Sequence, residues 1–255
     1  MPRQRLPYVP EYPYHLIARS NCKEWFVPDR GIVWNLFLGE LARIREKFEF
    51  KIHAFVLMGN HYHMLASYSE NYFLGRVMNL FQMNLSRKLN ILSGRINHQF
   101  GGPYRGSLIR NPYHYCNVLK YIYQNPVRAR ESSVVEYYQY SSIHEVMKTR
   151  NHIELYPPAA NLDAAIRHMS GPKLLNWLNI EYEIKEISDF RRGLSHPEFS
   201  LSPNRVTQKA NALSAQISSC AYDVNNQARI YSNNYNPHPQ REGTTSELPQ
   251  NDKPA

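Results

Sequence analysis

Two histidines separated by a single residue, His61 and His63, are the first candidates for chemistry in this chain. They lie in the largely apolar segment MGNHYHMLA, and in a strand the side chains of positions i and i+2 point to the same face. Two imidazoles about 6–7 Å apart along a strand can hold one divalent cation and leave further coordination positions open for a substrate. The alternative interpretation is a pair of partly buried, hydrogen-bonded histidines that bind no metal.

A second group of functional side chains lies in the segment LKYIYQNPVRAR. Tyr121 and Asn125 are four residues apart and therefore share a face near the end of one helix. The amide oxygen of Asn125 is a suitable third ligand for a hard cation, and the phenol of Tyr121 could attack a phosphate to form a phosphotyrosine. A phenol with an ordinary pKa of about 10 needs a nearby cation for this reaction.

Two alternatives to a nucleophilic Tyr121 remain open. In a chain with 19 tyrosines, Tyr121 could simply be a core residue. Tyr123 is the rival nucleophile, but it lies about 200° around the helix from Tyr121, so the two phenols cannot face the same metal. The four-residue spacing to Asn125 favours Tyr121.

The distribution of charge indicates the substrate class. The net charge is +9, and residues 1–150 carry 20 Lys and Arg against 10 Asp and Glu, whereas the remaining residues carry 10 against 11. From Asn71 to Arg130 there are nine basic residues and no acidic one. A field of one sign over this length predicts a polyanionic partner, most simply nucleic acid. A basic surface that serves only solubility is the alternative.

The elements that must position these groups alternate in a regular order. Hydrophobic periodicity and turn residues predict a strand, a helix, two strands joined by a tight turn at Gly59–Asn60, a second helix, a short strand and a third helix. Asp29 and Asn111 are expected to cap the first and third helices. This order predicts an α+β, ferredoxin-like split βαβ fold with a central antiparallel sheet and flanking helices. The expected strands are 14–20, 50–58, 61–68 and 101–109, and the expected helices are 27–49, 72–92 and 111–124.

The sequence predicts three regions along the chain. Residues 1–150 form the functional domain, 151–200 a helical extension of unknown role, and 201–255 a largely disordered tail rich in Asn, Ser, Gln and Pro. The three cysteines lie far apart, which indicates no disulfide framework and favours a reducing cytoplasm. Neither a signal peptide nor an apolar run of membrane-spanning length is expected.

Four segments together resemble a known family. MGNHYHML, YRGSLI, VLKYIYQNPVRAR and YQYSS, in this order and spacing, resemble the REP-associated tyrosine transposases, single-tyrosine members of the HUH endonuclease superfamily. The likeness covers roughly Tyr14 to Ser142, and it departs from the family at Gly59, where proline is usual.

The resemblance implies both an activity and a site. It implies a ferredoxin-like enzyme, associated with the nucleoid, that nicks single-stranded DNA next to a hairpin. His61, His63 and Asn125 would hold Mg²⁺ or Mn²⁺. Tyr121 would take the 5′ phosphate and leave a free 3′ hydroxyl, which can reverse the step. A monomer and a homodimer both agree with the sequence.

Contacts to DNA are expected from the basic residues and from one aromatic residue, with Arg105 as the strongest single candidate. Two other functions remain open: a hairpin-binding protein that no longer cuts, and a metal phosphoesterase that uses water without a covalent step. The predicted DNA-binding residues are Arg3, Arg5, Arg76, Arg87, Lys88, Arg95, Tyr104, Arg105, Arg110, Lys120 and Arg128.

Overall fold

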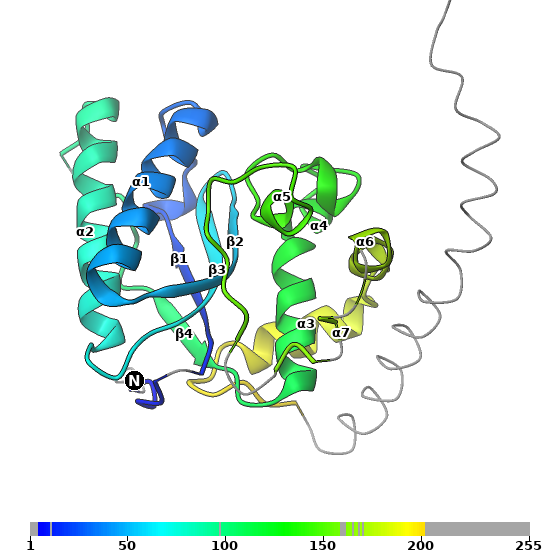
Figure 1. The fold of residues 1–255 in the computed structure, drawn as a ribbon. Coiled ribbons are helices and arrows are strands. Elements are labelled where there is room, and N and C mark those ends of the chain that lie inside the picture. Colours follow the sequence, from blue (N-terminus) through cyan, green and yellow to red (C-terminus); the bar gives the residue numbers. More distant parts are fainter. Residues whose placement is uncertain are drawn as a thin grey trace, which may run out of the picture.

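A four-stranded antiparallel sheet lies at the centre of the fold in the computed structural model (Figure 1). Its strand order is β2-β3-β1-β4, so that the first strand lies between the third and the fourth. The strands are β1 (Tyr14–Arg19), β2 (Lys51–Leu57), β3 (His61–Ser67) and β4 (Arg105–Leu108). The structure describes residues 5–201, except 11, 97, 159–161, 165, 168 and 170.

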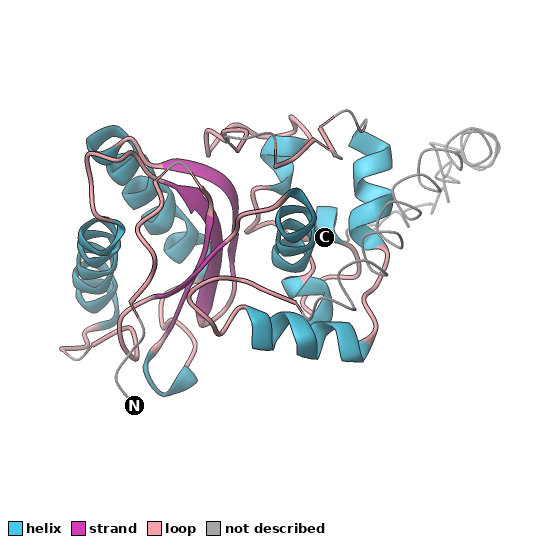
Figure 2. Cartoon of the chain, turned by 90° about the horizontal axis from the view of Figure 1, so that it is seen from below, coloured by secondary structure: helices cyan, strands magenta, loops and turns pink. Residues whose placement is uncertain are grey.

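Helices cover both faces of this sheet, as the view from below shows (Figure 2). The long helices α1 (Arg30–Phe48) and α2 (Leu74–Ser93) lie together on one face, and α3 (Pro112–Tyr123) packs against the opposite face. The predicted order of strands and helices is therefore confirmed, as is the α+β class with flanking helices. The shorter helices are η1 (Asn21–Lys23), α4 (Asn125–Arg128), η2 (Val135–Tyr137), α5 (Ile143–Val146), α6 (Gly171–Asn179) and α7 (Ile184–Gly193).

Local signals in the sequence explain where the helices begin. The Asp29 carboxylate accepts a hydrogen bond from the Gly31 amide at 2.7 Å, which caps α1 as expected. Asn111 caps α3 in the same way, with its side-chain oxygen 2.8 Å from the His114 amide and proline at the first helical position. In α2 the residues of the apolar stripe are all buried: Leu74, Val77, Met78, Phe81, Leu85 and Leu89.

The turn between β2 and β3 is closely packed at Gly59. A β-carbon at position 59 would lie 3.0 Å from the Arg30 guanidinium and 3.1 Å from the Trp25 ring. The backbone oxygen of Gly59 also accepts a hydrogen bond from the Phe26 amide at 2.9 Å. A larger residue at this position would therefore require the Arg30 and Trp25 side chains to shift slightly.

The core has two parts, one on each face of the sheet. The first lies between the sheet and the helices α1 and α2, and the second lies between the sheet and α3. Trp177, Leu178 and Phe190, from the predicted extension, are fully or almost fully buried in the second part. The helices α6 and α7 therefore complete the core around α3, while the domain boundary at residue 150 stays a prediction.

Two further expectations concern regions beyond this core. The predicted disordered tail, residues 201–255, lies outside the described residues apart from Leu201. Among the helices of the described ranges, none is both long enough and apolar enough to cross a membrane.

Candidate active site

The histidine pair lies on β3 and faces α3. The ring centres of His61 and His63 are 5.1 Å apart. The Nδ1 atom of His61 is 2.7 Å from the Asn60 side-chain oxygen, and the Nδ1 atom of His63 is 2.9 Å from Nε2 of His15. When both Nδ1 atoms donate these hydrogen bonds, both Nε2 atoms carry free lone pairs. This is the tautomer that a metal-binding histidine needs.

Burial keeps the imidazoles of this cluster neutral. It lowers the pKa of His15 to about 3 and, together with the charge of Arg19, lowers the pKa of His61 to about 4. Burial also lowers the pKa of His63 well below its ordinary value, and the neighbouring His15 and His61 add to the shift. Neutral imidazoles are the form that binds metal ions, so these side chains need not lose a proton at pH 7.

Tyr121 meets the histidines from the other side of the site. Its ring centre lies 5.8 Å from that of His63 and 6.1 Å from that of His15, edge-on in both cases. His61, His63, Tyr121 and Asn125 line one cleft between the sheet, α3 and the segment that follows α7. The structure thus brings together the four residues that the sequence predicted to act together.

Arg128 lies over the phenol ring of Tyr121, and Asn125 links Arg128 to the backbone at the end of α3. The guanidinium carbon of Arg128 lies 4.2 Å from the centre of the Tyr121 ring. Its Nη2 atom donates a 2.5 Å hydrogen bond to the side-chain oxygen of Asn125, whose Nδ2 atom donates to the Tyr121 backbone oxygen at 2.9 Å. Burial lowers the pKa of Arg128, and Tyr121 opposes this shift. A guanidinium in this position would stabilise a negative charge on the phenol.

The nitrogen and oxygen atoms of the cleft can be compared with the ligands that a divalent cation requires. Among the described residues, no three His, Cys, Asp or Glu side chains form a metal-binding group. Two neutral imidazoles whose Nδ1 atoms donate the hydrogen bonds described above nevertheless suit such an ion, provided that oxygen ligands complete the site. Asn125 was predicted to supply one, but its oxygen already accepts a hydrogen bond from Arg128. Because a carbonyl oxygen has two lone pairs, it retains one position for a ligand.

His15 and Arg19 belong to the site but were missed by the sequence analysis. In the register between β1 and β3, Ile17 lies opposite His63 and Arg19 lies opposite His61. Alternate residues of β1 therefore face the same side as the histidine pair, and His15 contacts His63 directly. The sequence HLIAR shows that His15, Ile17 and Arg19 point to one face of β1. Only the register between β1 and β3 shows that this is the face that carries His61 and His63.

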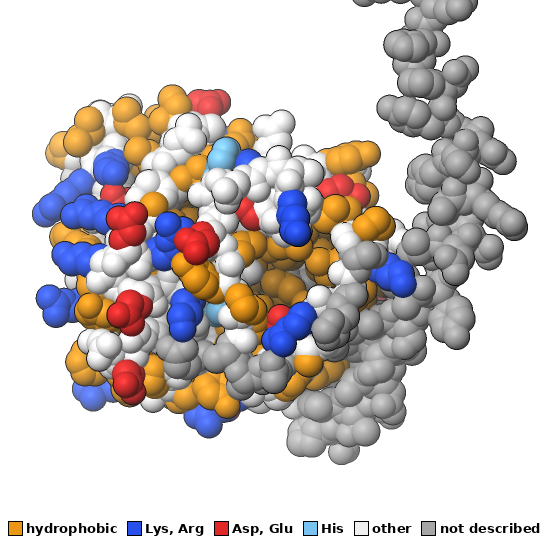
Figure 3. Space-filling model, in the orientation of Figure 1, with side chains coloured by type: hydrophobic (Ala, Val, Ile, Leu, Met, Phe, Trp, Pro, Cys, Tyr) orange, Lys and Arg blue, Asp and Glu red, His pale blue; other side chains and the backbone are white. Residues whose placement is uncertain are grey.

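The predicted DNA-binding residues fall into different environments. Arg105 lies opposite Ile17 on β4 and lines the cleft, and Arg5 and Arg87 line a separate groove beside α2. Arg76 is exposed, whereas Arg3 lies outside the described residues. The remaining exposed cations form ion pairs: Lys88 with Glu40 at 2.7 Å, Arg95 with Glu24 at 2.8 Å and Arg110 with Glu198 at 3.2 Å. In Figure 3, Lys and Arg side chains are most numerous along the edge where α1 and α2 lie.

Two of these residues are not placed as predicted. The Lys120 side chain is fully buried, and its ammonium lies 5.3 Å from the Trp177 ring centre and 4.9 Å from that of Tyr182. The prediction that Lys120 contacts DNA is therefore wrong, because α6 and the segment after it cover this face of α3. Tyr104 is only 8% exposed and packs in the first part of the core, which leaves little of its ring for base stacking.

Replacing Lys120 with alanine is expected to lower stability and leave the electrostatics of DNA binding unchanged. The change removes the alkyl chain from a packed site and both cation–π contacts, which predicts a loss of about 2–5 kcal/mol in the free energy of unfolding. Urea denaturation measures this loss. The matched variant is Arg105→Gln, which changes an exposed residue of the cleft. This variant should be as stable as the wild type, and the slope of log K for DNA binding against log salt concentration should become shallower by about one. The opposite pattern would contradict these placements.

Comparison with known proteins gives a family for the segment that contains this site. Residues 8–125 match the family model described as "Transposase IS200 like", and the matched segment extends from just before β1 to Asn125. This segment, a little under half of the chain, is therefore similar to the IS200-like transposases.

A more particular likeness is found among solved structures. The structure described as a REP-associated tyrosine transposase bound to a REP hairpin is 18% identical in sequence, with a TM-score of 0.48. The alignment covers 62% of this chain and 89% of that chain. A search of curated proteins found no match.

Proposed function

We propose that this protein nicks and rejoins single-stranded DNA next to hairpins of the REP type through a covalent 5′-phosphotyrosine at Tyr121. One observation carries the proposal: the Tyr121 ring lies 5.8 Å from the ring of His63, in the cleft that His61 and Asn125 also line. A protein that only binds DNA has no need of a phenol beside two neutral imidazoles. The match of residues 8–125 to a transposase family model agrees with chemistry on a DNA phosphate.

In the proposed reaction, the Tyr121 oxygen forms a bond to the scissile phosphorus and the bond from phosphorus to the 3′ oxygen breaks. The phenol proton passes to solvent, and the departing 3′ oxygen takes up a proton to become a free hydroxyl. The guanidinium of Arg128, 4.2 Å from the ring centre, stabilises the phenolate that attacks. The reverse attack by a 3′ hydroxyl restores the phosphodiester and the phenol, so that joining needs no external energy source.

His61, His63 and the second lone pair of Asn125 would hold Mg²⁺ or Mn²⁺ in this cleft. Such an ion, when bound, withdraws electron density from the scissile phosphate. His15 orients the His63 ring through its 2.9 Å hydrogen bond, and Asn60 orients His61 through a bond of 2.7 Å. Arg105, on the same face of the sheet, lies where it can contact the DNA backbone.

The proposed site is complete within one chain. Tyr121 and the histidine pair meet without a residue from a second subunit, so a monomer suffices for the proposed chemistry. The second part of the core supports this arrangement, because it joins α3 to α6 and α7 of the same chain. Residues 1–150 would then supply the reacting groups, and residues 151–200 would hold the helix that carries the nucleophile.

A labelled pool of hairpin oligonucleotides with single-stranded flanks, incubated with the protein and Mn²⁺, tests the proposal. We expect a covalent protein–DNA band on a denaturing gel. Binding without cleavage would instead indicate a hairpin-binding protein that does not cut. Cleaved DNA without a covalent band would indicate a phosphoesterase that uses water, and either result would overturn the proposal.

A further inference from the structure

Part of the wall of the active-site cleft comes from the extension after residue 150. The residues of the extension that line the cleft lie at the end of α7 and just beyond it: Arg191, Leu194, Ser195 and Pro197. Among these four only Arg191 carries a charge, and it is exposed. The extension therefore brings a guanidinium to the cleft that contains Tyr121 and the histidine pair.

Packing beside the nucleophile holds this end of α7 in place. Phe190, the residue before Arg191, is 1% exposed, and its ring centre lies 6.5 Å from that of Tyr121 and 4.9 Å from that of Tyr182. The Phe190 backbone oxygen also accepts a hydrogen bond from the Leu194 amide at 2.8 Å. Arg191 therefore reaches the cleft from a backbone that the buried Phe190 anchors near Tyr121.

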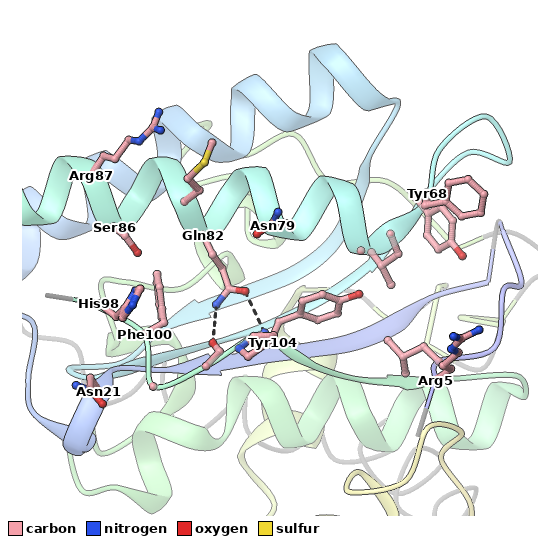
Figure 4. A pocket seen from close by; sticks show the side chains of 18 of the residues that line it. Arg5, Asn21, Tyr68, Asn79, Gln82, Ser86, Arg87, His98, Phe100 and Tyr104 are labelled. Carbon is pink, nitrogen blue, oxygen red and sulfur yellow. Dashed lines mark hydrogen bonds between the residues drawn. The ribbon is translucent and has the colours of Figure 1, made fainter. Parts of the chain in front are cut away.

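A second part of the wall is held from the side of α2. The loop 101–103, which lines the cleft, also borders the separate groove drawn in Figure 4. There the Gln82 oxygen accepts a hydrogen bond from the Tyr104 amide at 3.0 Å, and Gln82 Nε2 donates to the Gly102 oxygen at 3.4 Å. Arg105 follows this loop on β4, so the cleft has basic residues on two walls, each attached to the core by its own contacts.

The charge of the cleft is of one sign. None of the described residues that line it is acidic, and the basic ones come from different elements: Arg19, Lys23, Arg105, Arg128 and Arg191. Burial lowers the pKa of Arg128 and the charge of Arg191 lowers it further, whereas Tyr121 opposes the shift. Cations that repel one another in a cleft without carboxylates are stabilised when an anion binds among them.

Arg191 is available to such an anion, unlike the arginine next to it. Within the described ranges Arg191 forms no ion pair, whereas Arg192 donates a 2.5 Å hydrogen bond to the Asp189 carboxylate and does not line the cleft. A guanidinium presents parallel N–H donors that match two oxygens of a phosphate. The histidine pair lies on β3 and Arg191 on α7, so the two groups approach a phosphate in the cleft from different elements.

We infer that Arg191 binds a nonbridging oxygen of the DNA phosphate that lies against Tyr121, the phosphate at which the strand is cut. This inference rests on the proposed function for the identity of the phosphate. In the transition state of phosphoryl transfer, negative charge is spread over the oxygens that neither enter nor leave, so a guanidinium placed against them lowers the barrier. The extension then supplies a catalytic residue as well as the packing that holds α3.

Two neighbouring substitutions test this inference. Arg191→Gln and Arg192→Gln each remove one positive charge from the last turn of α7, but only Arg191 lines the cleft. Fluorescence anisotropy in EDTA gives the affinity for a pool of hairpins with single-stranded flanks, without cleavage, over a range of salt concentrations. The rate constant of covalent-band formation, measured in Mn²⁺ at saturating DNA, reports on the phosphate that reacts. Melting temperatures show whether both variants are folded.

We expect Arg191→Gln to make the slope of log K against log salt concentration shallower by about one, because one phosphate contact is lost. The rate constant at saturating DNA should fall by about 10²-fold, as for the loss of one donor that stabilises a transition state. Arg192→Gln should change neither quantity. Arg191→Lys should keep the slope but recover only part of the rate, since an ammonium lacks the two parallel donors.

Equal effects of Arg191→Gln and Arg192→Gln would overturn the inference, because a general loss of charge would explain both. A shallower slope with an unchanged rate would also overturn it, since Arg191 would then contact a phosphate away from Tyr121, and so would a slower rate with an unchanged slope. If neither quantity changes and the wild type forms the covalent band, the inference fails and the nicking proposal stands. If the wild type forms no covalent band, the nicking proposal fails, and a shallower slope in Arg191→Gln alone would still support a phosphate bound at Arg191.

Discussion

Replacing Tyr121 with phenylalanine is expected to abolish the covalent DNA adduct and to lower DNA cleavage by roughly 10³-fold or more. The substitution removes one oxygen atom, which in the proposed reaction is the atom that bonds to phosphorus. Phenylalanine keeps the ring beside His63 and beneath Arg128, so the packing of the site is retained. Hairpin affinity should therefore change little. Adduct yield on a denaturing gel and anisotropy with the same oligonucleotides measure the two effects.

Tyr123→Phe is the matched control for this experiment. Tyr123 lies on the same helix and is 2% exposed, but its hydroxyl is 3.0 Å from the Ser142 hydroxyl and it does not line the cleft. Its loss should cost about 1 kcal/mol of stability through one buried hydrogen bond and leave adduct formation intact. A covalent adduct that persists in Tyr121→Phe and disappears in Tyr123→Phe would reverse the assignment of the nucleophile.

The parts of the site that could be predicted from the sequence depend on local geometry. Side chains two apart in a strand share a face, so the joint projection of His61 and His63 follows from the strand alone. Residues four apart on a helix are neighbours, which relates Tyr121 to Asn125 without knowledge of the fold. The cap at Asn111 and the proline after it determine where α3 begins. The prediction that the two pairs meet came from the resemblance to a family.

The residues that the sequence analysis missed or misplaced depend on tertiary packing. His15 joins the site because β1 pairs with β3 in one register, and a shift by one residue would turn His15 to the other face. Lys120 looked like part of a basic surface, yet its position is decided by Trp177 and Tyr182, more than fifty residues away in the sequence. Charge along the chain says nothing about which basic residues a later segment will cover.

The same packing gives the segment after residue 150 a physical role. Nε2 of Gln124, at the end of α3, donates hydrogen bonds to the backbone oxygens of Leu178 at 2.7 Å and Ile180 at 2.6 Å. The Tyr182 hydroxyl donates to the Asn117 backbone oxygen at 3.1 Å. These bonds, with the burial of Lys120, attach α6 and the segment that follows it to the helix that carries Tyr121. A helix held in this way keeps its phenol at a fixed distance from β3.

The second large effect is expected when the histidines are replaced. His63→Ala removes a proposed metal ligand, so adduct formation should fall by about 10²-fold or more at any practical Mn²⁺ concentration, while hairpin binding persists. His15→Ala removes the 2.9 Å hydrogen-bond partner of His63, together with a buried ring that stacks on His63 and lies edge-on to Tyr121, but it removes no proposed ligand. Loss of such a supporting partner typically weakens metal affinity by about 10- to 100-fold. The Mn²⁺ concentration for half-maximal adduct formation should rise by that factor in His15→Ala, and excess Mn²⁺ should restore the yield.

His53→Ala separates these effects from a general loss of stability. His53 is buried like His63, but its ring nitrogens lie 2.7 Å from the Tyr156 backbone oxygen and 3.0 Å from the Ser67 hydroxyl, outside the cleft. Its replacement should lower the melting temperature and leave the Mn²⁺ dependence of adduct formation unchanged. A wild-type protein whose adduct yield is unaffected by EDTA, or a His63→Ala variant with normal Mn²⁺ dependence, would contradict the role given to these imidazoles. Because His15 contacts His63 and would act on the ion only through it, recovery of His15→Ala alone at high Mn²⁺ distinguishes a supporting residue from a ligand.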